Sequence, residues 1–144
     1  MRTEEMEVAA SIDSLSKVMS FIEENMRISC WPDSEINKVL VCAEEIFVNI
    51  ASYSYVESYS AIGKEGLCQI KVDTDIDARY MIRITFKDQG MPFNPLSMDS
   101  PDITLSADDR EIGGLGILMV RKMMDDVSYS YEYESNILTM VKYW

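Results

Sequence analysis

The chain has 144 residues, with 13 Lys and Arg against 25 Asp and Glu, a formal net charge of −12 and no histidine. The missing imidazole excludes Ser-His-Asp and Cys-His catalysis, histidine-ligated metals and autophosphorylation on histidine, so acid–base work must use carboxylates, Lys, Tyr or Cys. The negative charge argues against direct binding of nucleic acid, which needs clustered basic side chains. With 47% apolar residues, the composition is that of one globular domain over residues 1–144.

Cysteine usage and the N-terminal segment indicate the compartment. The three cysteines have no C-x-x-C spacing, which argues against a disulfide framework or a zinc site. The N-terminal segment is acidic, unlike a signal peptide, and no run of about 18 apolar residues could span a membrane. We therefore expect a cytoplasmic protein that does not contact the membrane.

The N-terminal half predicts one short strand and two helices. Residues 6–10 suit a strand, and a helix capped at 13–14 follows with apolar residues at helical spacing. A turn at 31–34 separates it from a longer helix, which is capped at 33–34 and ends near residue 55. The apolar stripes of both helices predict faces that pack on a core.

The C-terminal half predicts four strands and one helix. A polar loop at 58–66 comes first, and a turn at 73–77 joins the first two strands. Residues 94–112 contain two prolines and little periodicity, a pattern typical of a functional lid. A helix begins at residue 113. The order of elements predicts an α+β fold, a two-layer α/β sandwich with the helices packed on one face of the sheet. The expected strands cover residues 66–73, 78–88, 127–134 and 136–143.

A polar pair on the long helix is the first candidate for chemistry. Glu45 and Asn49 are four residues apart and so project from one face of the helix. A carboxylate can accept a proton, and an amide oxygen is a hard ligand suited to Mg²⁺. Taken alone, the pair is more typical of a solvated helix surface.

Two glycine-containing segments are the other candidates. Asp88 follows the clearest strand and Gly90 allows close backbone approach, so the carboxylate can accept hydrogen bonds from an exocyclic amine such as that of adenine; an ordinary turn explains the same residues. Gly113, Gly114 and Gly116 open a helix, where backbone N–H groups and the helix dipole favour an anion. A tight packing turn would have the same composition.

The order of these segments resembles the GHKL ATPase superfamily with its Bergerat nucleotide-binding fold, most closely the bacterial anti-sigma factor serine/threonine kinases. Residues 43–50 resemble the N box, 88–96 the first glycine box, 113–125 the second glycine box, and 136–142 the terminal strand. The resemblance covers nearly the whole chain. It implies a mixed, mainly antiparallel sheet with helices on one face and an ATP lid at 94–112.

The resemblance also implies roles for single residues. Glu45 would be the general base that activates a substrate serine or threonine hydroxyl, and Asn49 would hold Mg²⁺. Asp88 would bind the adenine amino group with room provided by Gly90, and Thr139 on the terminal strand would support Asp88 through water. The remaining implied ATP-binding positions are Phe93, Arg110, Gly113, Gly114, Leu115 and Gly116.

Two positions depart from the family pattern. Tyr53 stands where many members have a histidine, and Ile112 stands where a basic residue often precedes the second glycine box. Arg110, two residues earlier in the lid, is the candidate to reach the γ-phosphate.

The function implied by the resemblance is an ATP- and Mg²⁺-dependent serine/threonine kinase that phosphorylates an anti-sigma factor antagonist and sequesters a sigma factor. The family also suggests a homodimer. The alternative is a non-catalytic, ATP-dependent interaction module of the same fold. A self-sufficient sensor kinase is excluded, since the chain has no phosphoacceptor histidine.

Overall fold

The computed structural model describes residues 1–55, 66–97 and 114–144 of the chain. The strands are β1 (Arg2–Ala9), β2 (Leu67–Asp75), β3 (Met81–Asp88), β4 (Asp126–Glu132) and β5 (Ser135–Tyr143). The helices are α1 (Leu15–Ile28), α2 (Asp33–Tyr53) and α4 (Gly114–Met123), with short 3-10 turns η1 (Ile12–Ser14) and η2 (Pro95–Ser97). None of the helices described is long and apolar enough to cross a membrane.

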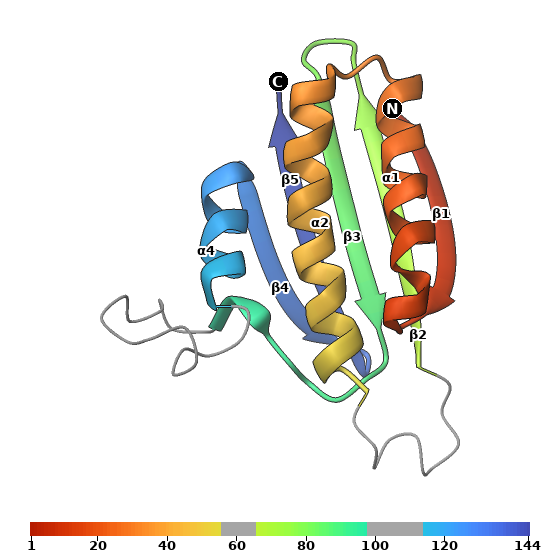
Figure 1. The fold of residues 1–144 in the computed structure, drawn as a ribbon, viewed down its shortest axis with the longest axis vertical. Coiled ribbons are helices and arrows are strands. Elements are labelled where there is room, and N and C mark those ends of the chain that lie inside the picture. The colour runs from red at the N-terminus through yellow and green to blue at the C-terminus, as the bar shows by residue number, and fades with distance from the viewer. Residues whose placement is uncertain (56–65, 98–113) are drawn as a thin grey trace.

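The five strands form one sheet in the order β1-β2-β3-β5-β4, and α1, α2 and α4 cover one of its faces (Figure 1). This arrangement confirms the predicted two-layer α+β fold. The resemblance implied a mixed sheet, but every pairing between the described strands is antiparallel. An antiparallel sheet can leave one face to solvent, and the open face here is polar, with Lys71, Arg83 and Lys87 at alternate strand positions.

The core lies between the helices and the covered face of the sheet. The apolar stripe of α2 is fully buried at Ile36, Ile46 and Phe47, and it faces buried strand residues such as Ile84 and Phe86. Burial of this apolar area is the main stabilising contribution to the fold. It also fixes the rotation of α2 about its axis, which decides where the polar residues of that helix point.

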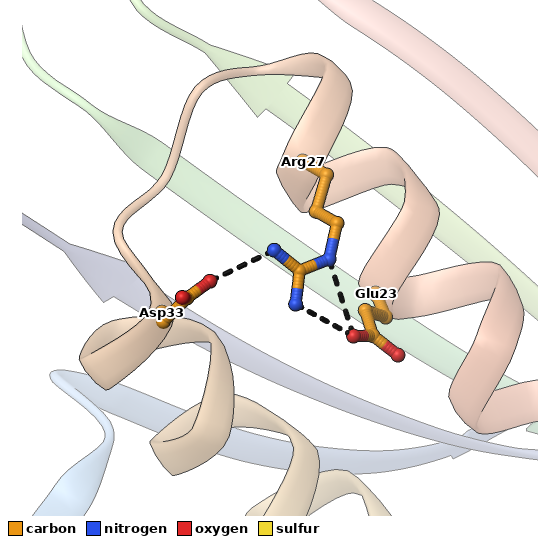
Figure 2. Close-up of polar contacts among 3 residues, drawn as sticks. All are labelled: Glu23, Arg27 and Asp33. Atoms are coloured by element: carbon orange, nitrogen blue, oxygen red, sulfur yellow. Dashed lines mark hydrogen bonds and ion pairs between the residues drawn. The ribbon is translucent and has the colours of Figure 1, made fainter.

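The junction between α1 and α2 differs from the predicted cap. Helix α2 begins at Asp33 after an N-cap at Pro32, and no side chain caps it. Instead the Asp33 carboxylate accepts a hydrogen bond from Nη1 of Arg27 at 2.8 Å, while Nε and Nη2 of Arg27 donate to Glu23 at 3.2 and 2.9 Å (Figure 2). These groups are largely exposed, so the contact adds little stability.

The hairpin between β4 and β5 turns one residue earlier than the sequence indicates. Tyr133 and Glu134 have φ values of 52° and 59°, the positive values that a two-residue type I′ turn requires. Glycine or asparagine usually marks such a turn, and neither is present here. The turn places Ser135 opposite Glu132 and sets the register of β5 against its neighbours.

Helix α4 is tied to the rest of the molecule at both its C-terminal end and its outer face. The buried Lys142 ammonium donates to the carbonyl of Met123 at 3.0 Å and lies 3.5 Å from the Glu35 carboxylate of α2. Nη2 of Arg121 donates to the carbonyl of Leu96 in η2 at 2.7 Å. These contacts join the C-terminal half of α4 to β5, to the start of α2 and to η2.

Candidate functional site

The first part of the site lies on the polar side of α2. Asn49 is 3% exposed, and its Nδ2 donates to Oε1 of Glu45 at 3.5 Å. Burial raises the pKa of Glu45 above its ordinary value, the hydrogen bond from Asn49 opposes this, and the charge of Glu44 adds to it. A carboxylate with a raised pKa is a stronger proton acceptor. The sequence expectation that the two side chains share a face is confirmed.

The N-terminal turn of α4 approaches this pair at Gly116. A β-carbon added to Gly116 would lie 2.0 Å from Cδ and 2.1 Å from Oε1 of Glu45. The absence of a side chain therefore lets the Glu45 carboxylate lie against the helix start, where backbone N–H groups and the helix dipole attract negative charge.

Asp88 forms the second part of the site, at the end of β3 and beside the end of α2 (Figure 1). Its carboxylate is 3% exposed and accepts hydrogen bonds from the Gly90 amide at 2.9 Å and from Ser54 Oγ at 3.2 Å. Burial raises the pKa of Asp88, and the hydrogen bonds from Asn136, Gly90 and Ser54 act against that rise. The carboxylate is thus a buried acceptor held by several donors.

Gly90 is required by the close packing at this point. A β-carbon on Gly90 would lie 2.1 Å from the carbonyl oxygen of Ser54. The next amide, that of Met91, donates to the same oxygen at 2.8 Å. The glycine therefore lets the segment after β3 pack directly on the end of α2.

The structure does not bring Thr139 to Asp88. In the antiparallel register, Asp88 pairs with Asn136, and Thr139 pairs with Thr85. Nδ2 of Asn136 donates to Oδ1 of Asp88 at 2.9 Å. The support that we expected from Thr139 through water is thus supplied directly by Asn136, three residues earlier on β5.

Asn136 and its partner Tyr129 are the residues that sequence reasoning missed. The hydroxyl of Tyr129 donates to Oδ1 of Asn136. Strand alternation contained the signal for Asn136: Leu138 and Met140 are buried on the helix-covered face, and only even-numbered residues of this strand share that face. Thr139 falls on the other side.

Aromatic rings lie close to Asp88. The rings of Tyr53 and Phe93 pack 5.0 Å apart, with an angle of 33° between their planes. A small cavity against Asp88 is bounded by Phe93, Tyr129 and Asn136, among others, and has a volume of about 10 Å³ open to the centre of a water molecule. That space holds about one water, whereas small-molecule pockets measure roughly 300–1,000 Å³.

The remaining residues that we expected in the site lie at the start of α4 or outside the residues that the structure describes. Gly114 and Leu115 are the first two residues of α4, and Gly116 follows them in the first turn of the helix. Residues 98–113 lie outside the described residues, so the expectations for Arg110, Gly113 and most of the lid at 94–112 fall there. The described part of the lid contains η2, which α4 binds through Arg121.

The polar groups of the site fit ATP and Mg²⁺. Asn49 presents an amide oxygen of the kind that suits Mg²⁺, and the start of α4 presents backbone donors that suit phosphate. Oδ2 of Asp88 accepts one described hydrogen bond, from Ser54, while Oδ1 accepts two, from Gly90 and Asn136. A carboxylate oxygen accepts more than one hydrogen bond, so Oδ2 is suited to an exocyclic amine.

Comparison with known proteins agrees with this geometry. The serine/threonine-protein kinase BtrW of Bordetella bronchiseptica is 22% identical over 142 residues, which are 99% of this chain and 94% of the relative. A chain of the SiaB-SiaC complex from Pseudomonas aeruginosa superimposes with a TM-score of 0.56 at 11% identity, covering 98% of this chain and 89% of that one; this likeness supports the fold alone. The family model of the histidine kinase-like ATPase domain matches residues 8–142. The chain therefore belongs to the histidine kinase-like ATPase domain family, as the resemblance predicted.

Proposed function

We propose that this protein is an ATP- and Mg²⁺-dependent serine/threonine kinase of the anti-sigma factor type, which phosphorylates an antagonist protein and sequesters a sigma factor. The observation that carries the proposal is the contact between the Glu45 carboxylate and the start of α4 at Gly116. It places a proton acceptor of raised pKa beside the helix turn suited to phosphate. The name of the relative from Bordetella bronchiseptica supports the same activity.

Each part of the site has a separate role in this proposal. Asp88 binds the adenine amino group, and the first turn of α4 binds the phosphates. Asn49 holds Mg²⁺, which supplies charge neutralisation at the phosphates when bound. Glu45 accepts the proton of the substrate hydroxyl as that oxygen bonds to the γ-phosphorus and ADP leaves. Phosphoryl transfer depends mainly on such positioning and electrostatics, so the missing histidine is no obstacle.

The proposed partners are proteins. A net charge of −12 is compatible with binding a basic segment of a sigma factor and disfavours DNA as a direct ligand. The identities of the sigma factor and the antagonist, the cytoplasmic location and the homodimer belong to the proposal and derive from the family resemblance.

The test is phosphate transfer from labelled ATP, with Mg²⁺, to a purified anti-sigma factor antagonist protein from the same organism. Glu45→Gln should lower the transfer rate by at least about 100-fold while ATP affinity stays within about threefold. Glu24→Gln, which makes the same chemical change at an exposed position of α1, is the matched control and should retain transfer.

The alternative function, a non-catalytic ATP-dependent interaction module, predicts a different pattern. Partner binding would then depend on ATP and on Asn49, and Glu45→Gln would leave every output unchanged. Intact nucleotide binding without any phosphate transfer by the unmodified protein would refute the kinase proposal.

A further inference from the structure

Both polar atoms of the Asn136 carboxamide form two hydrogen bonds each. Nδ2 donates to Oδ1 of Asp88 and to the carbonyl of Met91, both at 2.9 Å. Oδ1 accepts from the Phe93 amide at 3.0 Å and from the Tyr129 hydroxyl. The side chain is 4% exposed. One buried carboxamide thus joins the end of β3, the segment that follows it, and β4.

These contacts fix the orientation of the Asp88 carboxylate. Oδ1 accepts from both the Gly90 amide and Asn136, while Ser54 donates to Oδ2 at 3.2 Å. Rotation of the carboxylate would break the two hydrogen bonds to Oδ1. The carboxylate is therefore held in one orientation, with two described hydrogen bonds on Oδ1 and one on Oδ2.

We propose that Asn136 is a positioning residue that holds Asp88 for the 6-amino group of adenine and so sets the preference for adenine over 6-oxo purine nucleotides. The inference rests on the proposed binding of ATP at Asp88. A 6-amino group donates a hydrogen bond to an oxygen of the fixed Asp88 carboxylate. A 6-oxo group brings a second acceptor against a buried carboxylate, and an unpaired buried acceptor is costly.

Asn136 contributes to this preference also by limiting the space for water beside Asp88. The cavity at Asp88 has room for about one water molecule. Shortening Asn136 to alanine would remove the carboxamide and leave Asp88, Met91, Phe93 and Tyr129 without that partner, so water would enter. A water molecule can donate to a 6-oxo group and accept from a 6-amino group, so the hydrated site discriminates less.

The experiment measures the dissociation constants of ATP and ITP, both with Mg²⁺, by calorimetry. ITP differs from ATP at the purine in two linked ways: it carries 6-oxo in place of 6-amino, and its N1 carries a proton where that of adenine is an acceptor. In Asn136→Ala, the ratio of the ITP constant to the ATP constant should fall at least about tenfold. Thr85→Ala, a change on β3 at a position that pairs with Thr139 and not with Asn136, is the control and should keep the ratio within about twofold.

A second variant keeps the test independent of folding. Tyr129→Phe removes only the hydroxyl that donates to Asn136 and retains the ring, and it should lower the same ratio about threefold. If Asn136→Ala does not give a folded protein by circular dichroism, an unchanged ratio in Tyr129→Phe overturns the inference.

Three further results would overturn the inference. They are an unchanged ratio in folded Asn136→Ala, an equal loss of affinity for both nucleotides, which a general structural role would give, and an unmodified protein that does not prefer ATP. A protein that binds ATP with the expected preference but transfers no phosphate refutes the kinase proposal alone, because this experiment measures binding.

Discussion

Two glycines at the site meet different neighbours, and this difference leads to a prediction at the scale of single residues. A β-carbon on Gly90 would meet the backbone carbonyl of Ser54 at 2.1 Å, whereas one on Gly116 would meet the end of the flexible Glu45 side chain at 2.0 Å. Gly90→Ala must move the backbone, and we expect it to lower the free energy of unfolding by about 1–3 kcal/mol. Gly116→Ala needs only to displace Glu45, and alanine in a helix gains about 0.5–1 kcal/mol over glycine.

Urea unfolding and phosphate transfer separate the two effects. Gly116→Ala should keep the free energy of unfolding within about 1 kcal/mol and reduce transfer about 10- to 100-fold, because the general base is displaced. Gly90→Ala should show the larger loss of stability. Equal stability losses, or full transfer activity in Gly116→Ala, would contradict this account of the site.

Where a local pattern sets the position of a residue, that position could be predicted from the sequence. Where the pairing of strands sets it, the position could not be predicted. Glu45 and Asn49 share a helix face, and Asp88 ends a strand, so spacing alone places them. Asn136 acts through strand register with Asp88, which depends on the turn at Tyr133 and on contacts across the sheet. The family resemblance implied this supporting role for Thr139, and the strand register pairs Thr139 with Thr85 instead.

At the scale of elements, Asp73 links three strands and should make stability depend on pH. Its carboxylate on β2 is 2% exposed and accepts from Thr3 Oγ1 of β1 at 2.6 Å and from Arg83 Nε of β3 at 3.0 Å. Burial acts to raise the pKa of Asp73, but these hydrogen bonds and the charge of Arg83 outweigh it and lower the pKa. A lowered folded-state pKa contributes stability above the unfolded-state pKa, and this contribution is lost as pH falls through the folded value.

Asp73→Asn should remove that contribution. We expect the variant to be less stable than the unmodified protein by about 1–3 kcal/mol at pH 7, with the difference shrinking as pH falls from about 4.5 to 3. Urea unfolding at several pH values measures it, and Asp77→Asn in the exposed turn serves as the control. A difference that is the same at every pH would show that the charge of Asp73 has no part in it.

The elements themselves were predicted more accurately than their ends. Apolar residues at helical spacing predicted α1 and α2, and alternation predicted β2, β3 and β4. The ends depend on contacts outside the element or on unusual backbone: the Asp33 carboxylate at the start of α2 accepts from Arg27 of α1, and a type I′ turn forms at Tyr133 and Glu134 without glycine. Strand β2 continues through Asp73, which we expected in a turn, because Thr3 and Arg83 satisfy its buried carboxylate.

At the scale of the whole molecule, the net charge of −12 opposes the binding of an anionic triphosphate. Long-range repulsion of this kind must be offset locally, and a bound cation is often the largest local charge in such a site. The start of α4 offers only partial positive charge. The proposed binding of ATP should therefore depend strongly on Mg²⁺ and on Asn49.

Thermal unfolding tests this dependence, because a ligand that binds only the folded chain stabilises it by mass action. ATP with Mg²⁺ at about 100 times its dissociation constant should contribute about 2.7 kcal/mol, which raises the Tm of a chain of this size by about 5–10 °C. Replacing Mg²⁺ with EDTA, or changing Asn49 to alanine, should remove most of that rise. The control is Asn37→Ala, an exposed asparagine on the same helix, which should keep the full shift. A rise that is equally large in EDTA would mean that Asn49 does not act through a metal. The site draws on α2, β3, α4 and β5, so the unfolding transition with ATP should remain a single step.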